Sequence, residues 1–174
     1  MVIWIIGLSG SGKTTLSELV YERLKPKVPN LVRLDGDVIR DLFKNDVSHT
    51  MEGRLKNAER LSHLSRFLAS QDIHVIAAVL SIFPEWQRWN RENIPNYAEV
   101  YLKLSMETLY RRDIKNLYGP ARRGEIQNVV GIDIPFPPPL AAELVIENDQ
   151  DREEMGELVE QVLSLKAMQN LSKS

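Results

Sequence analysis

The sequence predicts an α/β protein in three layers, with helices on both faces of a mainly parallel sheet of five strands. Short apolar runs alternate with longer amphipathic stretches, and within each run the apolar residues are continuous. Continuous apolar runs are typical of parallel strands covered on both faces. Strands that alternate with helices indicate βαβ units. The expected strands are residues 2–6, 31–34, 74–79, 99–104 and 144–147.

The stretches between the strands favour helices. In residues 51–70, Leu61, Leu64 and Leu68 recur at helical spacing, so one face of this helix should pack on the sheet. The expected helices are residues 13–24, 37–43, 51–70, 84–93, 106–112 and 151–168.

The segment 115–139 breaks this alternation. It is rich in charged residues and glycine, and it ends in the run Pro-Phe-Pro-Pro-Pro. A loop of this length in a compact domain is usually functional, often as a lid over a binding site. We therefore expect one domain over residues 1–174 with a lid over about 115–139.

Composition limits the classes of protein and partner. The chain has 174 residues, a net charge of −2 and no cysteine. This length suits one domain with a substantial core, and the charge argues against a groove for a nucleic-acid polymer. Without cysteine there are no disulfides and no thiolate chemistry. We find neither an apolar run of membrane-spanning length nor the basic start of a secretion signal, so we expect a cytoplasmic protein without membrane partners.

Residues 7–14, Gly-Leu-Ser-Gly-Ser-Gly-Lys-Thr, fit the phosphate-binding pattern G-x-x-x-x-G-K-[ST] between an expected strand and an expected helix. In such a P-loop the backbone N–H groups and the helix N-terminus surround the phosphates. We expect Lys13 to reach the β- and γ-phosphates, the Thr14 hydroxyl to bind Mg²⁺, and Thr15 to approach the α-phosphate. The expected ATP-binding residues here are Gly7, Ser9, Gly10, Ser11, Gly12, Lys13, Thr14 and Thr15.

A P-loop alone does not distinguish kinases from other nucleotide hydrolases. The Asn-Lys-x-Asp motif expected in a small GTPase is absent from the sequence, and the chain is short for a transport ATPase. The length favours an architecture like that of the nucleoside monophosphate kinases, and hence a P-loop kinase.

Two carboxylates follow the second expected strand. Asp35 and Asp37 stand where ligands bind in open parallel sheets, beyond the carboxyl end of a strand. A kinase needs one carboxylate for Mg²⁺ or its water and one for the acceptor hydroxyl, and these residues can divide those tasks. Arg40, one helical turn after Asp37, could hold an anionic substrate. A purely structural interpretation makes Asp37 the N-cap of the next helix, but the nearby P-loop favours catalysis.

Three later segments extend the pattern: 111–118 (Arg-Arg-Asp-Ile-Lys-Asn-Leu-Tyr), 121–126 (Ala-Arg-Arg-Gly-Glu-Ile) and 131–139 (Gly-Ile-Asp-Ile-Pro-Phe-Pro-Pro-Pro). Together with the P-loop and residues 34–40 they resemble the adenylylsulfate kinase family over nearly the whole chain. Members of that family phosphorylate the ribose 3′-hydroxyl of adenosine 5′-phosphosulfate. The resemblance implies ATP as co-substrate, Mg²⁺ as cofactor and a homodimer.

The resemblance also implies roles for individual residues. Asp37 would be the base or the group that orients the hydroxyl, Asp35 a ligand of metal-bound water, and Lys115 a lid lysine that meets the transferring charge. The implied catalytic residues are Asp37, Lys13 and Lys115, and Arg112 would help to hold ATP. The implied acceptor-binding residues are Asp37, Arg40, His49, Arg54, Asn57, Arg60, Leu80, Ser81, Lys115, Leu117 and Val129. Without the resemblance, charged residues such as Arg54 and Lys115 would be interpreted as solvent-facing.

The chain departs from the family pattern on the acceptor side. Glu59 stands where the family has an arginine, and residues 80–83 read Leu-Ser-Ile-Phe in place of Ile-Ser-Pro-Tyr. The two aromatic residues that sandwich adenine align with His49 and Val129. Because stacking on an aromatic ring contributes about 1–3 kcal/mol per base, these changes affect recognition of the base.

The sequence leaves three hypotheses about the function. Adenosine 5′-phosphosulfate, the substrate of sulfate activation, is the first expected acceptor. Another nucleotide conjugate, such as the cytidine diphosphoramidate of capsule modification, is the alternative. A catalytically inactive nucleotide-binding module is the third hypothesis. The presence of Lys13, Asp37 and Lys115 argues against it.

Overall fold

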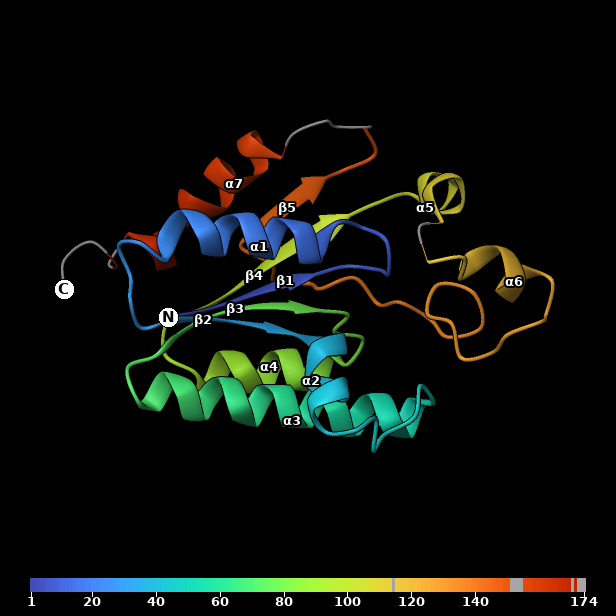
Figure 1. Ribbon diagram of the computed structural model, residues 1–174, viewed down its shortest axis with the longest axis horizontal. Coiled ribbons are helices and arrows are strands. Elements are labelled where there is room, and N and C mark those ends of the chain that lie inside the picture. Colours follow the sequence, from blue (N-terminus) through green and yellow to red (C-terminus); the bar gives the residue numbers. More distant parts are fainter. Residues whose placement is uncertain (114, 151–154, 170, 172–174) are drawn as a thin grey trace.

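The computed structural model describes residues 1–113, 115–150, 155–169 and 171. Five parallel strands form one sheet in the order β2-β3-β1-β4-β5 (Figure 1). The strands are β1 (Val2–Ile6), β2 (Leu31–Asp35), β3 (His74–Val79), β4 (Tyr97–Lys103) and β5 (Leu144–Glu147). The predicted fold class is confirmed, and among the described strands the sheet is wholly parallel.

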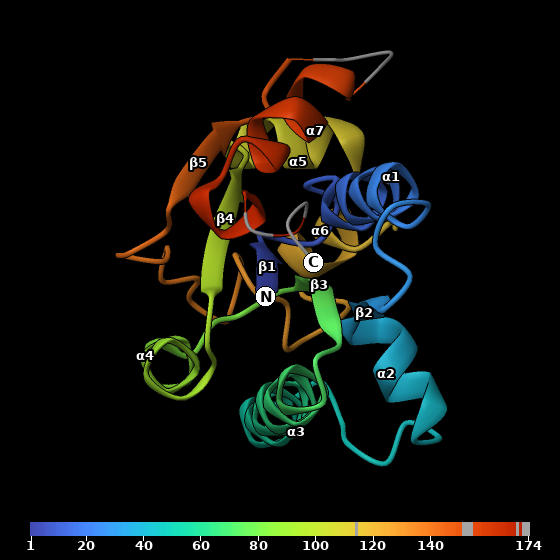
Figure 2. The same ribbon diagram turned by 90° about the vertical axis from the view of Figure 1, so that its left-hand side faces the viewer.

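Helices cover both faces of the sheet. Figures 1 and 2 show α1 and α7 on one face and α2, α3 and α4 on the other. These helices are α1 (Lys13–Leu24), α2 (Gly36–Leu42), α3 (Met51–Ser70), α4 (Pro84–Asn93) and α7 (Gly156–Leu163).

The central strand β1 contributes to both layers of the core. Ile3 and Ile5 pack in the cluster that includes Leu16 of α1, and Trp4 packs in the opposite cluster with Leu61 of α3. Burial on both faces explains why β1 is a continuous apolar run.

A third apolar cluster lies beyond the carboxyl ends of the strands. It joins Leu8 after β1 to Leu109 of α5 (Met106–Arg112), Tyr118 of α6 (Tyr118–Arg122) and Val130 of the lid segment. In Figure 1 these helices lie at the end of the sheet opposite the N-terminus. The cluster attaches the lid segment to the end of the sheet where ligands bind.

Some element boundaries differ from those predicted. β4 begins at Tyr97 rather than at residue 99 because Tyr97 and Ala98 pair with the first residues of β1. Helix α6 interrupts the segment expected to be a loop. Of the expected helix 151–168, the first four residues lie outside the described residues. The rest contains α7 and a short 3₁₀ helix, Lys166–Met168.

Among the described residues, no helix has the length and apolar character needed to cross a membrane.

Candidate active site

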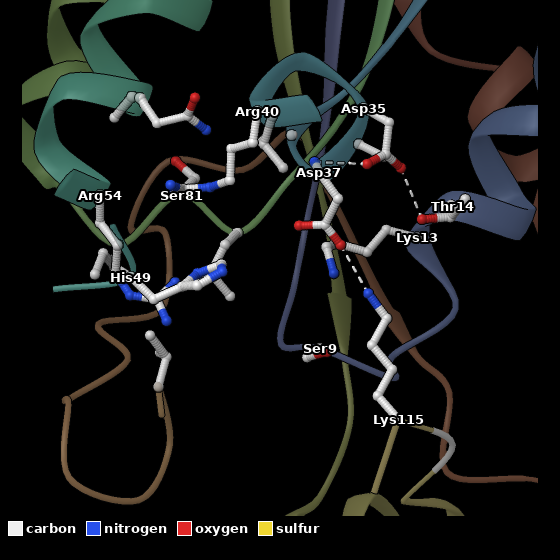
Figure 3. A pocket seen from close by; sticks show the side chains of 18 of the residues that line it. Ser9, Lys13, Thr14, Asp35, Asp37, Arg40, His49, Arg54, Ser81 and Lys115 are labelled. Carbon is white, nitrogen blue, oxygen red and sulfur yellow. Dashed lines mark hydrogen bonds and ion pairs between the residues drawn. The ribbon is translucent and has the colours of Figure 1, made fainter. Parts of the chain in front are cut away.

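A cavity of about 650 Å³ opens at the carboxyl ends of the strands. This volume is typical of small-molecule sites. Figure 3 shows Lys13, Thr14 and Lys115 on one side of the cavity and Arg54 and His49 on the other. The P-loop, the first residues of α2, the first turns of α3, the turn after β3 and the lid segment all contribute to its lining.

The P-loop turns from β1 into α1 through Gly12, whose φ of 96° lies in the left-handed region that favours glycine. Two side chains from distant parts of the chain hold the loop. Asn148 donates from Nδ2 to the Ser11 carbonyl at 3.0 Å, and the Tyr118 hydroxyl donates to the Ser9 carbonyl at 2.8 Å. Both hydrogen bonds hold backbone carbonyls of the P-loop in place.

Lys13 lies folded over the P-loop. Its Nζ donates to the Leu8 carbonyl at 3.0 Å. Burial lowers the pKa of Lys13 to about 8, although the nearby carboxylates of Asp37 and Asp35 act in the opposite direction. An ammonium group that is poorly hydrated and held by one carbonyl can turn readily to a phosphate.

Asp35 joins the P-loop to the start of α2. The Thr14 hydroxyl donates to Asp35 Oδ2 at 2.8 Å, and Asp35 Oδ1 accepts from the Asp37 backbone N–H at 2.9 Å. Asp35 is therefore the N-cap of α2, and the structural interpretation that gave this role to Asp37 is wrong. The Asp37 side chain is left to face the cavity.

Asp37 forms an ion pair with Lys115 of the lid segment, with 2.7 Å between Oδ2 and Nζ. Burial would raise the pKa of the Asp37 carboxyl, but the hydrogen bond and charge of Lys115 outweigh it and lower that pKa. The side chains are 66% and 59% exposed, respectively. Exposed ion pairs contribute little stability, so substrates can displace this pair easily.

Two guanidinium groups lie at the other end of the cavity. Arg40 is 6% exposed and donates from Nη1 to the carbonyls of Val47 and Ser48, both at 3.0 Å. Arg54 donates from Nη2 to the Asn128 carbonyl at 2.7 Å. Desolvation lowers the pKa of both arginines. Because these carbonyl partners are neutral, the positive charge here is available to an anionic ligand.

Two neutral groups complete this end. Asn57 is 6% exposed, and its Oδ1 finds no hydrogen-bond partner among the described residues. Burial, followed by the charges of Arg40 and Arg54, lowers the pKa of His49, so the imidazole is neutral at pH 7. Asn57 thus lines the cavity with an amide oxygen that has no hydrogen-bond partner among the described residues.

Most residues that the sequence assigned to the site lie together in this cavity. The predicted residues that line it are Ser9, Gly10, Gly12, Lys13, Thr14, Thr15, Asp35, Asp37, Arg40, His49, Arg54, Asn57, Leu80, Ser81, Lys115, Leu117 and Val129.

Four predicted residues do not line the cavity. Gly7 and Ser11 are buried within the P-loop. Arg60 forms an ion pair with Asp46, and Arg112 donates from Nη2 to the Gln150 carbonyl at 2.7 Å.

Three residues to which the sequence assigned no role support the site. Gln87 donates from Nε2 to the carbonyl and hydroxyl oxygens of Ser81, at 3.0 and 3.2 Å. Ser81 has a φ of 53°, an uncommon conformation for a non-glycine residue. Tyr118 and Asn148 hold the P-loop as described above. These contacts join residues far apart in the chain or through a turn, and local sequence patterns carry no signal for them.

The family model for adenylylsulphate kinase matches residues 1–147. The chain belongs to the adenylylsulphate kinase family. It is 42% identical to the adenylyl-sulfate kinase of Paraburkholderia xenovorans over 150 residues, which cover 86% of this chain and 84% of that one. It is 41% identical to the cytidine diphosphoramidate kinase of Campylobacter jejuni over 166 residues, covering 94% and 96% of the two chains.

A solved structure with the same fold is that of the Mycobacterium tuberculosis APS kinase CysC in complex with AMPPNP and APS. It is 31% identical, with a TM-score of 0.83, and the similarity covers 99% of this chain and 97% of that one. The protein is an ATP-dependent phosphotransferase with nucleotide substrates.

Proposed function

We propose that this kinase transfers the γ-phosphoryl group of ATP to the ribose 3′-hydroxyl of a small nucleotide, with adenosine 5′-phosphosulfate as the first acceptor. The Asp37–Lys115 ion pair carries this proposal. It stands between the P-loop and the arginines at the opposite end of the cavity (Figure 3). A carboxylate for the hydroxyl and an ammonium for the transferring phosphoryl group thus occupy the position where two nucleotides would meet.

In the proposed reaction, Asp37 orients the acceptor hydroxyl and accepts its proton. The hydroxyl oxygen bonds to the γ-phosphorus, while the bond from that phosphorus to the β–γ bridging oxygen breaks and ADP leaves. Lys13 and Lys115 stabilise the negative charge on the phosphoryl oxygens and on the leaving group.

The side chains of Thr14 and Asp35 fit a magnesium ion. A hydroxyl and a carboxylate lie 2.8 Å apart beside the P-loop, and Mg²⁺ prefers such oxygen donors together with water and substrate phosphates. When bound, the ion supplies positive charge that neutralises the phosphates.

The acceptor's 5′ anionic group would lie against Arg40 and Arg54. Both guanidiniums have neutral carbonyl partners and both are partly desolvated. An anion bound there gains charge-assisted hydrogen bonds without first displacing a carboxylate. Asn57 Oδ1 would accept from a donor of the same ligand.

We assign the whole chain to one kinase domain, with residues 115–139 as a lid that closes over the cavity and excludes water. Tyr118 and Val130 anchor this segment in the apolar cluster beyond the sheet. The family resemblance supports a homodimer, which light scattering of the purified protein would test.

Cytidine diphosphoramidate is the second candidate acceptor. In place of two aromatic residues that would enclose adenine, this chain has His49 and Val129, and Val129 is 3% exposed. A pocket with fewer aromatic faces loses stacking with a double-ring base, and this favours a smaller one. The similarity to the Campylobacter jejuni kinase supports this candidate.

An ADP-release assay with MgATP and each acceptor in turn tests the proposal. Acceptor-dependent turnover with adenosine 5′-phosphosulfate supports the first candidate, and turnover only with cytidine diphosphoramidate supports the second. ADP release that does not increase with either compound would contradict both assignments.

A further inference from the structure

The loop between α2 and α3, residues 43–50, is held against the acceptor end of the cavity from three directions. We name it the acceptor loop. The first contact comes from α3, where Arg60 donates from Nη1 and Nη2 to the two carboxylate oxygens of Asp46, at 3.0 and 2.6 Å. The same guanidinium lies 4.1 Å from the ring centroid of Phe43. This bidentate pair fixes the start and middle of the loop although neither partner lines the cavity.

The second contact comes from inside the cavity. Arg40 donates to the carbonyls of Val47 and Ser48, as described above. Arg40 therefore lines the cavity and also holds the backbone of the loop.

The third contact depends on Gly53 in the first turn of α3. A Cβ at this position would lie 2.8 Å from both the carbonyl carbon and the amide nitrogen of Ser48, and closer still to its carbonyl oxygen. Non-bonded carbon atoms prefer separations of about 3.5–4.0 Å, so any larger residue would push the Ser48 backbone by roughly 1 Å. Glycine is otherwise unfavourable within a helix. At this position it is needed because the loop backbone lies too close for a side chain.

His49 follows Ser48 directly and lines the cavity. We propose that the acceptor loop is the wall that selects the nucleotide acceptor, that Gly53 and the Arg60–Asp46 pair position it, and that it presents His49 to the acceptor. This inference rests on the proposed function, because it concerns the same acceptor. Gly53 and Asp46 are positioning residues, since they act through the loop.

The expected consequence of moving the loop is confined to the acceptor. A shift of roughly 1 Å in a positioning group can reduce a rate by about a hundredfold. Displacing Ser48 would move His49 and break the hydrogen bond to Arg40. The P-loop makes none of these contacts, so binding of ATP should be unaffected.

Kinetics of four variants test the proposal. Gly53→Ala and Asp46→Asn alter the positioning residues. Gly156→Ala is the matched control for the first, because a Cβ there would meet no atom within 4 Å, and Glu147→Gln, which alters the exposed ion pair with Lys103, is the control for the second.

We expect Gly53→Ala to raise the KM for the acceptor about tenfold or more, and Asp46→Asn about threefold, with the KM for ATP unchanged. The ratio of kcat/KM between the two candidate acceptors should also change in Gly53→Ala. Both controls should match the unaltered protein. An unchanged acceptor KM in Gly53→Ala, or an equal rise in the KM for ATP, would overturn the proposal.

Hydrogen–deuterium exchange tests the positioning without any acceptor. Residues 44–50 should exchange faster in Gly53→Ala than in Gly156→Ala, while α1 exchanges at the same rate in both. Equal exchange of the loop in the two variants would overturn the proposal. If the unaltered protein phosphorylates neither acceptor, the proposed function fails, and this exchange comparison still decides whether Gly53 positions the loop.

Discussion

The two ends of the cavity are built in different ways. The ATP end comes mainly from one short stretch, residues 9–15, which contains part of the loop after β1 and the first turn of α1. The acceptor end combines residues from α2, the acceptor loop, α3, the turn after β3 and the lid segment. A contiguous loop with one backbone shape suits a phosphate chain common to many substrates. A wall assembled from several segments can change at one position without disturbing the others, which suits recognition of different acceptors.

The largest effect should follow from a change at the ATP end. Lys13→Ala removes the ammonium that we propose for the β- and γ-phosphates, and we expect kcat to fall by about a thousandfold or more. Steady-state kinetics at saturating ATP would measure this. Lys103→Ala, on the exposed side of β4, is the control and should retain full turnover. If Lys13→Ala keeps near-normal turnover while folded, the ATP end has been wrongly assigned.

Asp37→Asn changes the point where the two ends meet. The amide cannot accept the proton of the hydroxyl, so we expect kcat to fall by about a hundredfold to ten-thousandfold with a similar melting temperature. Asp72→Asn at the far end of the sheet serves as the control. Near-normal turnover in a folded Asp37→Asn protein would remove Asp37 from the catalytic step.

The pH dependence of the rate separates the contribution of Lys13 at the ATP end from that of Asp37. Because burial lowers the pKa of Lys13 to about 8, kcat/KM for ATP should fall as the pH rises through this value, by up to about tenfold per pH unit. The pKa of Asp37 is below its ordinary value, so its carboxylate stays ionised at neutral pH and gives no loss there.

The substitution Lys13→Arg tests the origin of this alkaline limb. Arginine keeps its charge at all accessible pH values. The variant should lose the alkaline limb whatever its absolute rate. An identical limb in Lys13→Arg would show that another group causes it.

The smallest effect should come from the support of the acceptor end. Gln87→Met removes the donor that holds Ser81 in its uncommon backbone conformation, and we expect the acceptor KM to rise by about threefold to tenfold. The ATP KM should remain constant. Gln71→Met, at the exposed end of α3, is the control. A change in the ATP KM alone would contradict the division of the cavity into two ends.

Much of the fold could be predicted because local patterns determine it. β1 and α1 have the boundaries that the sequence predicted, since a buried apolar run and a helix-initiating P-loop both depend on neighbouring residues. The start of β4 and the existence of α6 could not be predicted in this way. Tyr97 joins the sheet by pairing with β1, and Asp113 starts α6 by accepting three backbone N–H groups.

For the candidate site, too, local patterns predicted some residues, whereas contacts between distant parts of the chain determine others. Lys13 and Thr14 belong to a motif that encodes both residue type and spacing. Asp35 was predicted from its place at the end of a strand, and its hydrogen bond with Thr14 puts it beside the P-loop. Arg60 could not be placed from the sequence, because a charged residue in a helix can face either the cavity or a carboxylate of a nearby loop. In the structure it pairs with Asp46. Gly53 is a second example, because the sequence does not show that the Ser48 backbone lies too close to this position for a side chain.

The cavity between the P-loop and the two arginines is proposed to direct the phosphoryl group to the acceptor's ribose 3′-hydroxyl. Phosphorus–proton correlation NMR of the product, formed with MgATP and the acceptor that turns over, identifies the hydroxyl that was phosphorylated. We expect a new phosphorus signal that correlates with the ribose H3′ proton. Correlation with H2′ or with a proton of the base, or the appearance of inorganic phosphate alone, would contradict it.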